Sequence, residues 1–130
     1  MFSALATLLG VTLIVLALRD VFHQLFHPSG AGSISGALMK AVWRTFCLLA
    51  RRYPSLLALA GPGALVAIIA NWVVLLALGF ALVYWPRLPG GFAFATALDP
   101  SKEGGFVDAL YLSLVTLATL GFGDITPTTG

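Results

Sequence analysis

The sequence predicts an all-α membrane protein with two membrane-spanning helices and one shorter helix that enters the bilayer without crossing it. Hydrophobic residues make up 59% of the 130 residues and charged residues only 9%, against roughly 45–50% and about 25% in typical globular chains. A soluble domain of this size exposes too much surface to hide that apolar excess. The other two observations are two long uncharged apolar segments and the Pro- and Gly-rich breaks around them.

The same composition excludes several classes of protein. Disordered chains are poor in Leu, Val, Ile and Phe, which are abundant here. Seven Lys and Arg residues against five Asp and Glu residues give a net charge of +2, too little for nucleic-acid binding by charge, so no nucleic-acid partner is expected. Cys47 is the only cysteine, which excludes an internal disulfide. No acid pair, activated nucleophile or phosphate-binding loop indicates an enzyme, and no cofactor is expected.

The first apolar segment runs from Met1 to Leu18 without a charge, close to the lower limit for spanning a bilayer. Its pattern continues to Phe26, and Pro28 ends it, so residues 1–27 are predicted to form an N-terminal transmembrane helix. A cleaved signal peptide is the alternative. It requires basic residues before the apolar run and small residues after it, whereas nothing basic precedes this run and Arg19-Asp20 follows it.

Residues 28–61 are predicted to be a linker that contains a basic amphipathic helix over Ala37–Tyr53, which Pro54 ends. On a helical wheel one face is mostly basic, with Lys40, Arg44, Cys47 and Arg51. The opposite face is apolar, with Leu38, Val42, Phe46, Leu49 and Tyr53. This pattern favours a helix on the membrane surface beside anionic headgroups. The alternative is a helix that packs on another part of the protein.

Ala64–Trp85 is the second long apolar segment, and Asn71 is its only strongly polar residue. Its 22 residues reach about 33 Å as a helix, enough for a hydrocarbon core of about 30 Å. Tyr84 and Trp85 at its end suit the membrane–water boundary. An irregular loop is predicted over Pro86–Gly105. Phe106–Ala118 is apolar again but too short to span, which predicts a re-entrant or buried helix.

The basic residues predict the topology. Five of them lie between the two long segments, namely Arg19, Lys40, Arg44, Arg51 and Arg52, and only Arg87 and Lys102 lie elsewhere. Cytoplasmic loops carry the excess of Lys and Arg, so residues 19–61 are placed in the cytoplasm. The N-terminus and the segment after Trp85 are then external. The expected location is the cell membrane, with several passes through the lipid bilayer.

The chain after the short helix reads Thr116-Leu117-Ala118-Thr119-Leu120-Gly121-Phe122-Gly123-Asp124. This segment resembles the selectivity filter of potassium channels, whose pattern is T-x-x-T-x-G-[YF]-G-D. An apolar helix, a loop and a short helix precede the filter in that family, as they do here. The resemblance covers residues 62–130 and is greatest to two-transmembrane-type pore modules, including the two-pore-domain group. A plain turn after a buried helix is the alternative reading.

The resemblance implies a passive, K⁺-selective channel. A ring of backbone carbonyls replaces the water shell of the ion, and the implied K⁺ ligands are the carbonyls of Thr119, Leu120, Gly121 and Phe122 with the Thr119 hydroxyl, in a filter that extends to Gly123. Glycine at two of these positions reaches backbone conformations that other residues avoid. The Leu120 and Phe122 side chains would pack against the short helix. One chain supplies a quarter of the ring, so the resemblance implies a homotetramer.

By the same resemblance, Thr116, Asp124 and Tyr111 support the filter. The family acid behind the filter corresponds to Asp124. Val115 stands where certain bacterial channels carry a Glu, which leaves Tyr111 as the candidate partner of that acid. Ala118 replaces a common Thr, and Phe122 lacks the hydroxyl of the commoner Tyr. Both differences remove hydrogen bonds around the filter.

Pore modules of this family carry a second spanning helix after the filter, and this chain ends at Gly130. Residues 62–130 are therefore expected to be a partial module with an outer helix, a pore helix and a filter, from a longer protein. Two alternatives to a channel subunit remain open. One is a non-conducting membrane subunit. The other is a component of a channel-like K⁺ transporter, although such transporters usually carry weaker filter repeats with a single fixed glycine.

Overall fold

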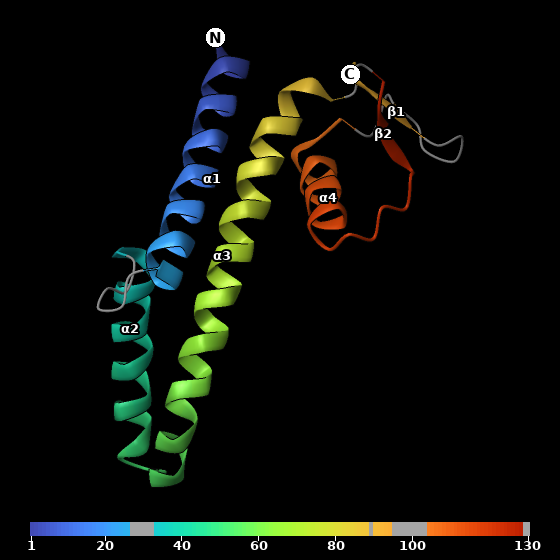
Figure 1. The fold of residues 1–130 in the computed structure, drawn as a ribbon. Helices are drawn as coiled ribbons and strands as arrows, with labels where there is room; N and C mark the ends of the chain where they lie inside the picture. The colour runs from blue at the N-terminus through green and yellow to red at the C-terminus, as the bar shows by residue number, and fades with distance from the viewer. Residues whose placement is uncertain (27–32, 89, 95–103, 129–130) are drawn as a thin grey trace. The chain divides into compact units, whose positions relative to one another are not determined.

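The computed structural model describes residues 1–26, 33–88, 90–94 and 104–128. Four α-helices carry most of this part of the chain: α1 (Phe2–Phe26), α2 (Ser33–Ala50), α3 (Ala60–Tyr84) and α4 (Phe106–Leu117) (Figure 1). Two short 3₁₀ helices, η1 (Pro54–Leu59) and η2 (Trp85–Arg87), flank α3. Two strands, β1 (Phe92–Phe94) and β2 (Ile125–Pro127), complete the described elements. The predicted all-α membrane-type fold is confirmed.

Two helical stretches, Phe2–Phe26 and Ser55–Arg87, are long and apolar enough to cross a membrane by length and composition. At 12 residues, α4 is shorter. The first stretch overlaps the helix predicted over residues 1–27, of which residue 27 lies outside the described residues, and the second contains the predicted Ala64–Trp85 and extends it at both ends. In particular, α3 begins four residues before Ala64, because Pro62 lies in its first turn, where a missing N–H breaks no helical hydrogen bond.

The chain divides into two compact units, one of residues 1–15 and 75–130 and the other of residues 16–74. In the first unit, the beginning of α1 runs beside the end of α3 in the opposite direction (Figure 1). A Cβ atom added to Gly10 would lie 2.6 Å from the Gly79 carbonyl oxygen. The two backbones therefore touch, in the manner of small residues between membrane helices.

The core of the first unit lies where the end of α3 meets α4 and β2. Ala81, Leu88, Ala109, Leu112 and Ile125 are its buried members. The aromatic residues Tyr84, Trp85, Phe92 and Phe106 pack around them. Ser113, only 1% exposed, donates its hydroxyl hydrogen bond to the Ala77 carbonyl at 2.9 Å. This bond and the apolar contacts attach α4 to α3.

The prediction of an irregular loop over Pro86–Gly105 is wrong for its first part. Trp85–Arg87 continues α3 as η2, and β1 pairs with β2 in an antiparallel ribbon in which Ala93 faces Thr126. The apolar ring of Phe92 explains the strand, because it packs against Tyr84 with a centroid distance of 6.0 Å. Residues 95–103 of the predicted loop lie outside the described residues.

The second unit is organised around Asp20, which is 3% exposed. Its carboxylate accepts hydrogen bonds from the backbone N–H groups of Ile34 at 3.1 Å and Ser35 at 3.2 Å. It also accepts one from the Ser35 hydroxyl and one from the indole N–H of Trp72 at 3.0 Å. Asp20 thus caps the beginning of α2 from a distant part of the chain, satisfying amides that have no partner within the helix.

The apolar face predicted for the basic helix is partly covered by the chain itself. Phe46 is half-buried, and its ring lies 3.1 Å from the position that a Cβ on Gly63 would take. At this point α2 packs on the chain itself. Lys40, Arg44 and Arg51 of the basic face are exposed. Contact of this basic face with lipid stays a prediction.

Candidate ion-binding segment

The short helix α4 positions the candidate segment. It begins after Gly105, whose backbone N–H donates to the Asp108 carboxylate at 2.9 Å, a capping interaction that also places a negative charge at the positive end of the helix dipole. The face formed by Ala109, Leu112, Ser113 and Val115 is buried. The orientation of α4 is therefore fixed, and its C-terminal end leads directly into Thr119–Asp124.

The helix ends through a tight set of backbone hydrogen bonds. The Thr119 N–H donates to the Thr116 carbonyl at 3.0 Å, and the Leu120 N–H donates to the Val115 carbonyl at 3.0 Å. The Thr116 hydroxyl donates to the Leu112 carbonyl of its own helix at 2.8 Å. Thr116 therefore contributes to the candidate segment through its carbonyl, which holds Thr119. Because helix C-termini carry partial negative charge, the end of α4 favours a nearby cation.

The backbone of the segment alternates in handedness. Three residues have positive φ, namely Thr119 at +56°, Gly121 at +52° and Gly123 at +73°, and they are separated by Leu120 and Phe122, which do not. Alternation of this kind turns successive carbonyl oxygens toward the same side of the chain. Positive φ in a β-branched residue is rare and strained, and such strain concentrates at functional sites. The conformation of Thr119 therefore points to this stretch independently of the glycines.

The side chains of the segment are open to their surroundings in the single chain. Leu120 is 59% exposed and Phe122 is 66% exposed, so the expected packing of these two side chains against the short helix is not formed within one chain. A Cβ atom added to Gly121 or Gly123 meets no atom within 4 Å. Glycine is required at these positions by the positive φ, and not by lack of space.

The far end of the segment is tied back to α4. The Tyr111 hydroxyl donates to the Asp124 carboxylate at 2.6 Å, the pair suggested from the sequence. Asp124 also accepts the N–H of Ile125 at 3.1 Å, and Ile125 is buried in the core. The hydrogen bond to Asp124 raises the pKa of Tyr111 above its ordinary value of 10.0, because losing the proton would remove the bond and place two negative charges together.

Two structural contributors were not identified from the sequence. Ser113 anchors α4 to the Ala77 carbonyl. The sequence feature that could have identified it is a single polar residue on the buried face of an apolar helix. Asp20 organises the second unit through partners 14 to 52 residues away. The sequence feature that could have identified Asp20 is a carboxylate at the end of an apolar run. Placing an unpaired carboxylate in a membrane helix costs free energy, so a partner is expected.

Comparisons with known proteins agree with this geometry. The model of a family described as ion channel matches residues 68–130. The potassium channel protein kcv of Paramecium bursaria Chlorella virus 1 is 40% identical over 52 residues, which cover 38% of this chain and 53% of kcv. The two pore potassium channel c of Oryza sativa subsp. japonica is 40% identical over 52 residues, covering 40% of this chain and 10% of that channel.

A third relative is similar over nearly the whole chain. The uncharacterized membrane protein YdjJ of Bacillus subtilis is 27% identical over 122 residues, 93% of this chain and 35% of YdjJ. The chain thus spans between a tenth and about half of the length of these three relatives. No solved structure matches the chain significantly. The family match, the two potassium channels and the backbone geometry together support a potassium channel pore module over residues 68–130.

Proposed function

We propose that this protein is a subunit of a K⁺-selective channel that conducts passively through the backbone of Thr119–Gly123. The observation that carries the proposal is the alternation of positive φ at Thr119, Gly121 and Gly123. An ion that enters a narrow pore must exchange its water shell for other oxygens, and carbonyls that point to one side of a chain supply them. The ligands are the carbonyls of Thr119, Leu120, Gly121 and Phe122 with the Thr119 hydroxyl.

Four copies are needed, because one segment supplies only one side of a ring. Closed rotational symmetry is the usual arrangement of identical subunits. The exposure of Leu120 and Phe122 in the single chain supports this assembly, since large apolar side chains beside an ion path require cover from neighbouring subunits. Irregular backbone at membrane depth is tolerated only where it is buried in protein or lines a cavity.

The organisation of the chain follows from the same proposal. Residues 1–27 form an N-terminal transmembrane helix, residues 28–61 a cytoplasmic linker, and residues 62–130 the outer helix, pore helix and filter of the pore module. The N-terminus and the filter then lie on the external side. The Tyr111–Asp124 bond supports this arrangement, because it ties the end of the filter to the pore helix.

The test is an ion-flux measurement on the full-length protein in lipid vesicles. Vesicles loaded with K⁺ should lose it down its gradient, while Na⁺-loaded vesicles should not leak. Chemical cross-linking in the same vesicles should stop at four subunits. A tetramer that conducts neither ion would favour a non-conducting subunit, and flux that saturates and needs a second ion would favour a transporter component.

A further inference from the structure

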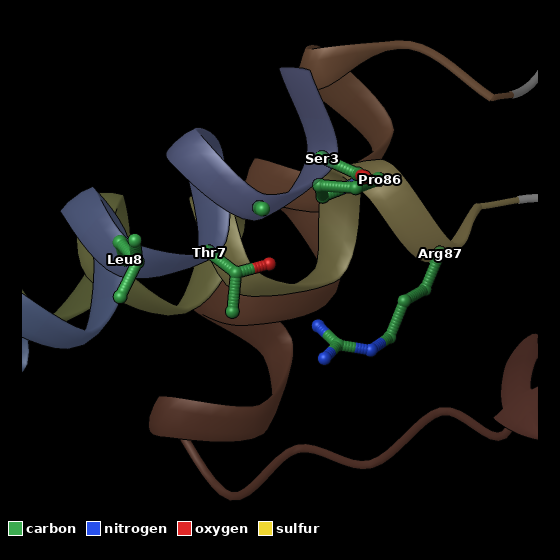
Figure 2. Close-up of a pocket in the computed structure, with 6 residues that line it drawn as sticks. Ser3, Thr7, Leu8, Pro86 and Arg87 are labelled. Atoms are coloured by element: carbon green, nitrogen blue, oxygen red, sulfur yellow. The ribbon is translucent and has the colours of Figure 1, made fainter. Parts of the chain in front are cut away.

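A cleft of about 600 Å³ lies in the first unit, between the first turns of α1 and η2, which directly follows α3. Ser3, Ala4, Thr7, Leu8, Pro86 and Arg87 line it. Figure 2 shows the Arg87 guanidinium and the Thr7 hydroxyl directed into the same space. We propose that this cleft binds the phosphate of an anionic phospholipid, with an acyl chain along α1. The proposal needs a membrane-spanning chain but does not depend on ion conduction.

The polar groups around the cleft are all suited to a phosphate. Arg87 donates one hydrogen bond to the Val83 carbonyl at 2.5 Å, which turns the guanidinium back along α3 and leaves most of its five N–H groups for a ligand. Within the described part of the chain, Arg87 makes no ion pair, and neither the Ser3 nor the Thr7 hydroxyl has a hydrogen-bond partner. A planar guanidinium beside hydroxyl donors matches the several oxygens of a phosphate.

The position of the cleft along the helices selects a lipid as the source of that phosphate. Arg87 lies two residues after Trp85, whose ring packs edge-on against Phe2 of α1 with centroids 5.1 Å apart. Aromatic rings at the ends of spanning helices mark the level of the lipid headgroups. Leu8 is 64% exposed and extends the lining away from the guanidinium. The cleft therefore has a cationic end at headgroup level and an apolar end toward the hydrocarbon, as a phospholipid requires.

The charge predicts selectivity among lipids. Phosphatidylglycerol has a net negative charge that Arg87 compensates, whereas phosphatidylcholine carries its own cation. A single basic residue near a membrane surface changes the affinity for anionic lipid by about fivefold. Arg87→Gln should lower the affinity for phosphatidylglycerol by about this factor. Arg87→Lys should recover part of it, because the charge remains while the forked geometry is lost.

The experiment is lipid titration of the full-length protein by native mass spectrometry, with phosphatidylglycerol or phosphatidylcholine added to protein in detergent. We expect wild-type protein to prefer phosphatidylglycerol, Arg87→Gln to lose about fivefold in affinity for it, and Thr7→Val to lose less. Arg19→Gln is the matched control, since Arg19 is an exposed arginine of the other unit and lies outside the basic face of α2. Circular dichroism checks that each variant keeps its helices, and Thr7→Val serves if Arg87→Gln does not fold.

Three outcomes would overturn the proposal. Equal lipid affinities of Arg87→Gln and Arg19→Gln would show that the lipid does not use the cleft. Equal affinities for the two lipids would remove the role of charge. Displacement of phosphatidylglycerol by millimolar inorganic phosphate would show that the cleft takes a free phosphate and not a lipid.

Discussion

The requirement for glycine at position 121 provides a quantitative test of the ion-binding segment. Gly121 has φ of +52°, and a Cβ atom added there meets no atom within 4 Å. Within one chain, the effect of Gly121→Ala therefore arises from the backbone alone. A left-handed conformation costs an L-residue about 1–2 kcal/mol, so four copies in a ring would lose about 4–8 kcal/mol, comparable with the whole stability of many proteins.

A series of substitutions separates this backbone effect from side-chain size. Asn is larger than Ala but tolerates positive φ better, and β-branched Val tolerates it worst. We expect tetramer stability and K⁺ flux to fall in the order wild type, Gly121→Asn, Gly121→Ala, Gly121→Val. Gly90→Ala is the matched control, because Gly90 is exposed, lacks a positive φ and has no atom within 4 Å of the added Cβ.

Stability is measured as the midpoint of thermal dissociation of the assembly, and flux as K⁺ release from vesicles. If the losses of stability and flux follow side-chain volume, with Ala tolerated better than Asn, they arise from crowding and not from the backbone angle. That result would refute the reasoning. Equal losses in Gly90→Ala and Gly121→Ala would also refute it, since only the second position has the left-handed backbone.

Three further predictions concern contacts around the segment and the helices. Tyr111→Phe removes the donor to Asp124 and should shorten the time for which K⁺ flux persists after K⁺ is lowered. Because the pKa of Tyr111 is raised above 10.0 in the folded protein, the wild-type hydrogen bond is fully present below pH 10.0 and weakens as the pH rises through the higher folded-state pKa. In a pH series, the flux of wild type and variant should therefore converge above that pKa. Asp20→Asn replaces a buried acceptor of N–H groups with a group that is itself partly a donor, so the free energy of unfolding in detergent should fall by about 1–3 kcal/mol, and an unchanged denaturation midpoint would contradict the capping role. Gly79→Val places a Cβ 2.7 Å from a side chain of α1 and should destabilise by about 1–3 kcal/mol, whereas Gly61→Ala, with no atom within 4 Å, should not.

The helices and the candidate segment were predictable from the sequence for different reasons. Long apolar runs determine where α1 and α3 lie, because lipid requires such runs, and Pro28 and Pro86 follow closely after their ends. The segment was predictable because its spacing of Thr, Gly and Asp resembles a known pattern. The Tyr111–Asp124 bond followed from the same resemblance, since Val115 leaves no acid for Asp124 to contact.

Other features depend on contacts between distant residues and could not be predicted. The β1–β2 ribbon joins two three-residue strands, which are too short to show an alternating pattern. The partners of Asp20 become neighbours only when three helices pack together. The sequence also contains no indication that Leu120 and Phe122 lie uncovered in one chain, because apolar residues are expected to be buried.

The central claim is that the carbonyls of Thr119–Gly123 select K⁺, and the reversal potential tests it most directly. The full-length protein is reconstituted in a planar bilayer with K⁺ and Na⁺ at the same total concentration on both sides, and K⁺ on one side is then replaced stepwise by Na⁺. We predict a reversal potential that follows the K⁺ gradient, by about 59 mV for each tenfold change, and loss of this behaviour in Gly121→Ala. Conduction that reverses at zero potential whatever the K⁺ gradient would contradict the account.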